Sequence, residues 1–464
     1  MRCILFTLLV LCFISCNNKF RDATLVITNI NIIDPVHQKI IPGQTILIKD
    51  SIIVGVVSAG LSKMNIADAL VIDGTGKYII SGFWNMHTHV CRKDNLSQTV
   101  LPVLLSYGIT GVRDMGGDVA IMNNFKKQIL QNPVSGPVIY GAGPILDGDP
   151  PVHPDFSIAL TKQNFKQKLD SLYTQKPDFF KVYSLLPEEL VEEISVYARQ
   201  KHMNFAGHIS EYIPPVRAAQ LHQKSFEHLN RIDELYHDSM ALNGFIAAVK
   251  TNNTWLCPTL IVYQRKVEMA EGKKLQHPLY ESIDPSLKQE WLQAQQKRRE
   301  QGSAPDKLAM LKNTFSEQKA LVTRFYKENI PMLIGSDFAG MAFIYPGYSF
   351  HEEMALLSQT GFSNYDILKM ATYNPAVYFN ITNKHGTIEK GKIANMVMLD
   401  ENPVVDIRNT LKIGEVIRQG KRIVIISQPQ EVQMNAIKAV PVCAKFFYNE
   451  KIRTYRRHQL GVYH

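Results

Sequence analysis

Apolar and polar residues alternate in short runs over residues 23–80. The runs read ATLVITNINIID, GQTILIKDSIIVGVV and ALVIDGTGKYII, with Asp73-Gly74 as a turn in the last of them. Alternation of this kind, interrupted by turn residues, predicts β-strands. Similar runs return at 386–400, GTIEKGKIANMVMLD, and at 415–424, EVIRQGKRIV. We therefore expect a small β-sandwich built from both ends of the chain, over residues 23–80 and 386–430.

Between these ends, over residues 81–385, apolar runs alternate with segments of helical period such as 187–202. This pattern predicts βαβ units around a parallel sheet, and therefore an α/β fold. The apolar runs lie at 83–90, 110–117, 138–146, 178–184, 204–210, 225–230, 254–263 and 331–338. Eight strand–helix units over about 260 residues match the usual size of a TIM-type (β/α)8 barrel. We expect this barrel to be inserted in the sandwich, with a helical excursion at 264–329 over its mouth.

Composition and charge narrow the class of protein. The chain has 464 residues, of which 45% are hydrophobic and 20% charged, which excludes a disordered or fibrous protein. The formal net charge is +9, and a basic tail at 440–464 carries much of it. Because no basic stripe with interleaved aromatic residues is present, we do not expect a nucleic-acid partner.

The first sixteen residues, MRCILFTLLVLCFISC, have one Arg and then an apolar stretch too short to span a bilayer. This pattern is typical of a signal peptide, and its end before Cys16 resembles a bacterial lipoprotein signal. We expect an exported protein, a periplasmic or outer-membrane lipoprotein of a bacterium that meets the membrane only through a lipid on Cys16. An ordinary secretory signal cleaved nearby is the alternative. No CxxC pair is present, so neither a zinc ribbon nor a disulfide framework is supported, and a bridge between Cys91 and Cys257 stays open.

Polar residues stand at the ends of several apolar runs. In WNMHTHV, His87 and His89 are two residues apart, so on a strand both side chains project from the same face. Taken alone, such a pair is more typical of hydrogen-bonded or surface histidines than of a metal site. Strand ends converge on one rim of a barrel, however, so we expect these two to share a site with later residues. Those residues are Lys181, His208, His228 and Asp337.

The ordered set of motifs resembles the metal-dependent amidohydrolase superfamily, in its imidazolonepropionase-like and prolidase-like branch (Xaa-Pro or Xaa-Arg dipeptidase type). The matching stretches run in family order from about residue 23 to 424 and include SGFWNMHTHV, YGITGVRDMGG, FFKVYS, AGHIS, SFEHL, LIGSD, HEEMALLSQTGFSNYDILKMATYNPA and GTIEKGKIANMVMLD.

The resemblance implies a metal-ligand set. His87 and His89 would hold a first ion with Asp337, and His208 and His228 would hold a second. Lys181 would bridge the two as a carbamate formed with carbon dioxide, since an unmodified lysine is an ammonium that cannot ligate a cation. Zn2+ suits imidazole and carboxylate ligands, as one ion, or as two if Lys181 is carbamylated.

Further residues are candidates for substrate contacts, each with a structural alternative. His153 lies in GPILDGDPPVHP (143–154), where prolidase-like members place a Gly-Gly-His loop that polarises the carbonyl; the alternative is a surface turn. Tyr183 would donate to an oxyanion or be a core aromatic residue. Arg113 would bind a substrate carboxylate or form a structural ion pair with Asp114 or another acid. His351 would contact substrate or simply begin a helix.

The function that the resemblance implies is hydrolysis of a C–N (amide) bond in a small substrate, a dipeptide or an N-acyl amino acid. A metal-bound hydroxide would attack, with Asp337 as general acid and base. One alternative is a hydrolase of cyclic amides, because the loops after the strands select the substrate. Another is a non-catalytic binding lipoprotein on the same scaffold. The sequence leaves the exact substrate and the oligomeric state open.

Overall fold

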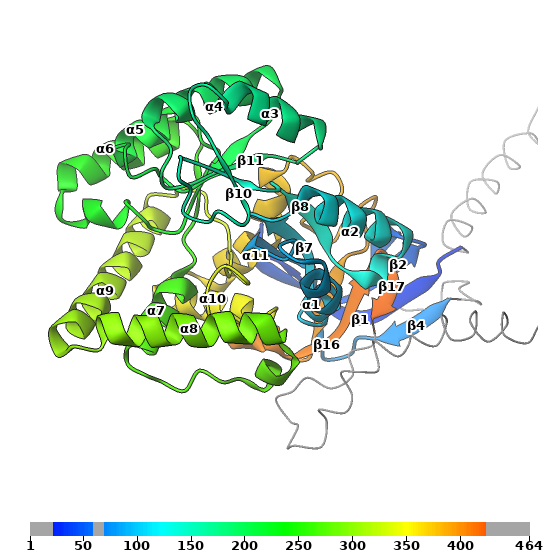
Figure 1. Cartoon of the computed structure of the whole chain (residues 1–464). Coiled ribbons are helices and arrows are strands. Elements are labelled where there is room, and N and C mark those ends of the chain that lie inside the picture. Colours follow the sequence, from blue (N-terminus) through cyan, green and yellow to red (C-terminus); the bar gives the residue numbers. More distant parts are fainter. Residues whose placement is uncertain (1–21, 59–68, 424–464) are drawn as a thin grey trace, which may run out of the picture.

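The computed structural model describes residues 22–58 and 69–423 (Figure 1). The expected signal peptide with Cys16, the basic tail at 440–464 and the last residues of the expected sandwich lie outside the described residues. Within the described part of the chain, no helix combines the length and the apolar character needed to cross a membrane.

Strands from both ends of the chain form one mixed sheet. Its order is β17-β16-β15-β5-β1-β2-β3, with β4 paired to β1, and the antiparallel pair of β5 with β15 joins the two ends. The strands are β1 (Leu25–Asp34), β2 (Lys39–Lys49), β3 (Ile52–Val57), β4 (Leu70–Asp73), β5 (Tyr78–Ser81), β15 (Met396–Leu399), β16 (Ile413–Arg418) and β17 (Lys421–Ile423).

The expected sandwich is therefore hydrogen-bonded into a single sheet, and β1 explains why. Its first half, Leu25–Thr28, pairs with β4, whereas Asn31 and Ile32 pair with β5. Irregular register between Ile27 and Ile32, where Asn29 adopts a positive φ of 54°, separates the two halves. Such bulges bend a strand, so β1 serves two groups of partners.

The central part of the chain forms two parallel sheets. One contains β6 (Phe83–Thr88), β7 (Ile109–Asp114) and β8 (Val138–Gly141), in that order. The other has the order β10-β9-β11-β12-β13-β14. Its strands are β9 (Ile145–Asp147), β10 (Ser157–Ala159), β11 (Phe180–Val182), β12 (Phe205–Gly207), β13 (Ser225–Glu227) and β14 (Trp255–Cys257). Most of these strands are buried on both faces, as parallel strands between helices are.

The eighth expected strand, residues 331–338, is irregular. It makes only isolated bridges, from Met332 to β14 and from Phe338 to β6, so it lies between the two parallel sheets. The chain passes so close to β6 that a Cβ at Gly335 would lie 2.5 Å from Cβ of His87, and Asp337 adopts a φ of 60°. This close passage and turn replace a regular ladder. The arrangement of the parallel strands is consistent with a TIM-type barrel.

Helices follow the parallel strands and cover them (Figure 1). The run at 254–263 divides at Pro258-Thr259 into β14 and the start of α7, and the excursion at 264–329 is helical as expected. It lies against segments that follow strand ends, because Glu290 pairs with Lys93 after β6, and Gln318 donates to Asp233 after β13. The helices are α1 (Asp94–Ser106), α2 (Val119–Gln131), α3 (Phe165–Thr174), α4 (Glu188–Gln200), α5 (Pro215–Gln220), α6 (Ser239–Thr251), α7 (Leu260–Ala270), α8 (Pro285–Gly302), α9 (Pro305–Lys327), α10 (Tyr348–Gln359) and α11 (Asn364–Tyr378).

Candidate metal centre and active site

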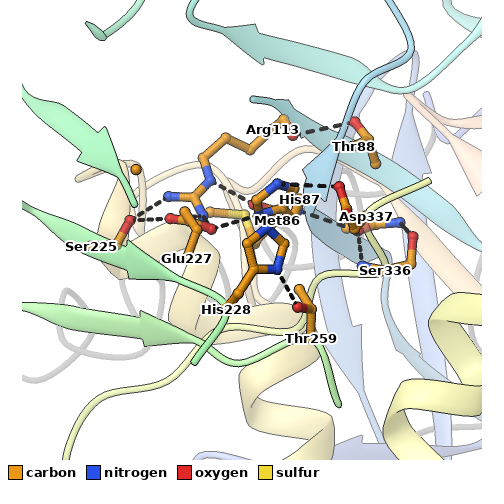
Figure 2. Close-up of polar contacts among 12 residues, drawn as sticks. Met86, His87, Thr88, Arg113, Ser225, Glu227, His228, Thr259, Ser336 and Asp337 are labelled. Carbon is orange, nitrogen blue, oxygen red and sulfur yellow. Dashed lines mark hydrogen bonds and ion pairs between the residues drawn. The ribbon is translucent and has the colours of Figure 1, made fainter. Parts of the chain in front are cut away.

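Two histidines and an aspartate meet where β6 and the 331–338 segment end. Oδ1 of Asp337 lies 3.4 Å from Nε2 of His87 and 3.3 Å from Nε2 of His89. Backbone hydrogen bonds hold the two segments side by side, from the amide of Asp337 to the carbonyl of His87 at 2.8 Å and from the amide of His89 to the carbonyl of Phe338 at 2.9 Å. Figure 2 shows His87 and Asp337 directed toward each other. All three side chains are buried.

The other ring nitrogen of each histidine has a fixed partner. Nδ1 of His89 lies 2.9 Å from the carbonyl oxygen of Gly116, and Nδ1 of His87 lies 2.8 Å from Oε2 of Glu227. A carbonyl or carboxylate oxygen only accepts, so each Nδ1 carries the hydrogen and donates it. Both Nε2 atoms therefore present a lone pair toward Asp337, which is the arrangement that a metal-binding imidazole requires.

His208 and His228 join the same cluster from β12 and β13. The ring of His228 lies 4.6 Å from that of His87 and 5.0 Å from that of His208, measured between centroids. Nδ1 of His228 is 2.6 Å from Oγ1 of Thr259, and Nδ1 of His208 is 3.1 Å from Oγ of Ser184. The structure thus brings together the four histidines that the sequence placed at the ends of three predicted strands.

Lys181 projects from β11 into this cluster and is 1% exposed. Among the described residues, neither its Nζ nor Nε2 of His87 has a hydrogen-bond partner. An unpaired buried ammonium is costly, so a protein rarely keeps one without a purpose. Burial lowers the pKa of Lys181 to about 8, against the negative charges of Glu227 and Asp337. Two buried nitrogens without a hydrogen-bond partner in one cluster indicate a site that binds an additional group, such as a metal ion.

The charge states of the cluster suit a cation. Burial lowers the pKa of His87 to about 4 and the pKa values of His208 and His228 well below 6.5. Burial raises the pKa of Asp337, but the surrounding histidines lower it further than burial raises it. Near neutral pH the imidazoles of His87, His208 and His228 are therefore neutral, and the carboxylate of Asp337 is ionised. These residues fit a divalent metal ion such as zinc.

Arg113 is a structural residue rather than a substrate contact. It is 0% exposed, and its Nη2 donates to Oε1 of Glu227 at 2.7 Å. Its Nη1 donates to Oγ of Ser225 at 2.8 Å, and its Nε donates to the carbonyl of Met86 at 2.6 Å (Figure 2). The structure corrects the expected substrate role in favour of the alternative ion pair, with Glu227 as the acid instead of Asp114.

Glu227 is the residue that the sequence reasoning missed. It lies on β13 between Arg113 and His87 and is 2% exposed. The signal was present in SFEHLN, where an acidic residue interrupts an apolar run directly before His228. A buried acid in that position needs a partner.

His351 does not join the cluster. It is 2% exposed, and its Nδ1 and Nε2 contact Oγ1 of Thr410 at 2.9 Å and the carbonyl of Tyr107 at 3.0 Å. Its ring packs on Phe83, which begins β6, at the opposite end of that strand from His87. The structure therefore corrects the expected substrate contact, and His351 anchors the start of α10 instead.

His153 and Tyr183 lie at the edge of the cluster. Nε2 of His153 is 3.1 Å from the hydroxyl of Tyr183, whose ring lies 4.0 Å from that of His208 between centroids. Burial raises the pKa of Tyr183, so the phenol stays protonated and can donate. Cys91 and Cys257, whose pairing the sequence left open, are free and buried.

Residues 78–423 match the profile of the Amidohydrolase family. The chain belongs to the amidohydrolase family. Family membership makes this amidohydrolase a metal-dependent enzyme that acts on C–N bonds, as the ordered motifs indicated. Among curated protein sequences, none matches the chain.

Solved structures share the fold of this amidohydrolase. A Xaa-Pro dipeptidase with bound methionine in the active site is 18% identical with a TM-score of 0.67, over 86% of this chain and 99% of that one. A prolidase complexed with N-methylphosphonate-L-proline is 19% identical with a TM-score of 0.67, over 86% and 99%. The bottromycin amidohydrolase is 18% identical with a TM-score of 0.69, over 89% and 90%.

Proposed function

We propose that this amidohydrolase hydrolyses the amide bond of a dipeptide or an N-acyl amino acid. The observation that carries the proposal is the buried meeting of two Nε2 lone pairs and the carboxylate of Asp337, beside the unpartnered Nζ of Lys181. Structural neighbours that include a Xaa-Pro dipeptidase and a prolidase favour this class of substrate. We also propose that the parallel strands close into a TIM-type barrel whose rim carries the site.

His87, His89 and Asp337 would hold a first metal ion. His208 and His228 would hold a second, with Lys181 as a bridging carbamate; zinc suits this set of neutral imidazoles and carboxylates. A divalent ion supplies two things in such a site, activation of water and polarisation of the scissile carbonyl.

The residues around the cluster supply proton transfer and orientation. Asp337 is ionised, so its free oxygen would accept a proton from the attacking water and deliver it to the leaving nitrogen. The hydroxyl of Tyr183, held beside His153, would donate to the oxygen that becomes negative during attack. Glu227 and Gly116 keep the two histidines of the first motif in one orientation and tautomer.

Hydrolysis by the zinc-loaded protein of a panel of dipeptides and N-acyl amino acids, beside a panel of lactams, tests the proposal. We expect cleavage of dipeptides or N-acyl amino acids. The Asp337→Asn variant should lose roughly 10²–10⁴-fold in kcat/KM, because it removes the proton acceptor. The matched control is Asp306→Asn, on the exposed face of α9, which should keep full activity. Activity on lactams alone would overturn the proposed substrate class.

A further inference from the structure

Two half-buried cations lie on the helices that border the site. Thr259 is the N-cap residue of α7, and Tyr263 and Lys266 follow it at i+4 and i+7, so the three share one face of this helix. Thr259 contacts His228 at 2.6 Å, and the hydroxyl of Tyr263 accepts from the amide of Leu229 at 2.6 Å. This face therefore runs along the segment that carries His228, and Lys266 continues it by one turn, with Nζ 4.7 Å from the centroid of the Tyr263 ring.

Arg298 lies on the inward face of the neighbouring helix. On α8, Leu287 and Trp291 are buried, and Arg298 continues the same face at i+11 and i+7 from them. Trp291 packs against Phe343 and Tyr345, with ring centroids 5.3 and 5.2 Å apart, so this face is directed into the protein. Helices α7 and α8 pack against each other, which brings the two cations to adjoining surfaces (Figure 1).

Neither cation has a counter-ion among the residues that the structure describes. Within residues 22–58 and 69–423, Lys266 and Arg298 form no ion pair, whereas Arg265, one residue from Lys266, pairs with both Glu268 and Glu352 at 2.6 Å. Taking an uncompensated charge partly out of water costs free energy, and an anion from outside would offset that cost.

The electrostatic surroundings connect this pair to the metal cluster. Burial lowers the pKa of Lys266, the charge of Arg298 lowers it further, and the negative charges of Asp337 and Asp233 raise it. Lys266 in turn lowers the pKa of His208. Asp233 is held by Nε2 of Gln318 at 2.8 Å. The positive charge of Lys266 therefore acts on residues of the metal cluster itself.

We propose that Lys266 and Arg298 bind the carboxylate of the substrate while its amide bond lies at Asp337. The inference rests on the proposed function, and it assigns two residues to the free carboxylate that the proposed substrates carry. A guanidinium offers two parallel donors to a carboxylate, and the ammonium adds a third with a second positive charge. A dipeptide or an N-acyl amino acid has this group, whereas a neutral lactam or a peptide amide lacks it.

Calorimetric binding of L-amino acids and their amino alcohols to the zinc-loaded protein tests this pair without requiring catalysis. An amino alcohol keeps the side chain and the amine but has no carboxylate. We expect the wild type to bind the preferred amino acid at least about tenfold more tightly than its alcohol, and Lys266→Met and Arg298→Met each to lose about tenfold of that preference. Lys266→Arg should retain this preference. The matched control is Lys297→Met, an exposed position next to Arg298 on α8.

Other outcomes separate this inference from the proposed function. If no dipeptide or N-acyl amino acid is cleaved but the preference for carboxylates depends on Lys266 and Arg298, the proposed function fails and the binding site stands. Equal binding of acids and alcohols, no binding of either, or an unchanged preference in both methionine variants would overturn the inference. Methionine is a good helix former, and unfolding temperatures near that of the wild type would verify that the variants fold.

Discussion

The orientation of His87 depends on the partner of its Nδ1 atom, the ring nitrogen directed away from Asp337. Glu227 holds Nδ1 of His87 and pairs with the guanidinium of Arg113, and all three are at most 2% exposed. The pair of Arg113 and Glu227 replaces water around both charges, and the pKa of Glu227 is low because Arg113 and His87 outweigh the opposing effect of burial. One carboxylate thus neutralises a buried arginine and orients a histidine of the candidate metal site.

The Glu227→Gln variant should lose both roles. An amide cannot neutralise Arg113, and a buried charge without its partner destabilises a fold by about 3 kcal/mol or more. The amide can present either its oxygen or its NH2 group to Nδ1 of His87 and so no longer fixes the tautomer, and metal affinity should fall roughly 10–100-fold. Urea unfolding and metal content after dialysis measure the two effects. The control is Glu193→Gln, an exposed position on α4. A Glu227→Gln protein with the same unfolding free energy and the same metal content as this control would contradict the role assigned to Glu227.

The first residues of helix α7 orient His228. Thr259, the N-cap residue, adopts a left-handed φ of 48° and contacts Nδ1 of His228. The side-chain carboxyl group of Glu353 on α10 accepts from the amides of Leu260 at 2.9 Å and Ile261 at 2.7 Å, which otherwise have no partner within the helix. Glu353 therefore fixes the end of α7 from which Thr259 orients the histidine.

The pH dependence of stability should reveal Glu353. Burial raises its pKa from 4.5 to about 8, although the two backbone amides lower it in part. Between these values the folded protein keeps a proton that the unfolded chain has released, so this residue's contribution to stability is present below pH 4.5 and is lost as pH rises toward 8. The Glu353→Gln variant should lose about 1 kcal/mol through a weaker cap. In urea unfolding, the difference in unfolding free energy between this variant and the wild type should shrink between pH 5 and pH 8. The control Glu300→Gln, on α8, should show no such change with pH.

The sequence predicted the secondary-structure elements and the residues at their ends better than the side-chain contacts between them. The HxH pair and the later histidines could be placed because each follows an apolar run, and parallel strand ends meet at one edge. Thr259 and Glu353 could not be placed, and the interrupted apolar run marked Glu227 as a buried acid without showing what it contacts. Each of these contacts joins residues far apart in the chain and depends on side-chain geometry. His351 was misplaced because a helix start gives no information about which end of the strands it faces. The 331–338 segment matched a strand in composition, but Gly335 lets it pass too close to His87 for a regular ladder.

Across the whole molecule, the site joins segments from separate sheets. His87 and His89 come from the sheet of β6–β8, Lys181, His208 and His228 from the sheet of β9–β14, and Asp337 from the segment between them. Metal ions held by these residues and joined through Lys181 would link both sheets, and such ions bind the folded chain far better than the unfolded one. Their binding free energy is therefore added to stability.

Metal removal should lower the unfolding temperature. At a free metal concentration about a hundredfold above Kd, the bound ion adds roughly 3 kcal/mol, so chelation should lower Tm by several degrees, reversibly on adding zinc. The His89→Asn variant is the control, because it lacks a ligand and should respond weakly to chelator and to zinc. A wild-type Tm that does not respond to either would count against a site that links the sheets.

The meeting of His87, His89 and Asp337 around a metal ion is the central claim, and anomalous diffraction at the zinc edge tests it most directly. Crystals grown with zinc should show an anomalous peak in contact with Nε2 of both histidines and with the carboxylate of Asp337. Well-ordered crystals in which these three side chains surround no peak, or in which zinc lies only elsewhere on the protein, would contradict the account.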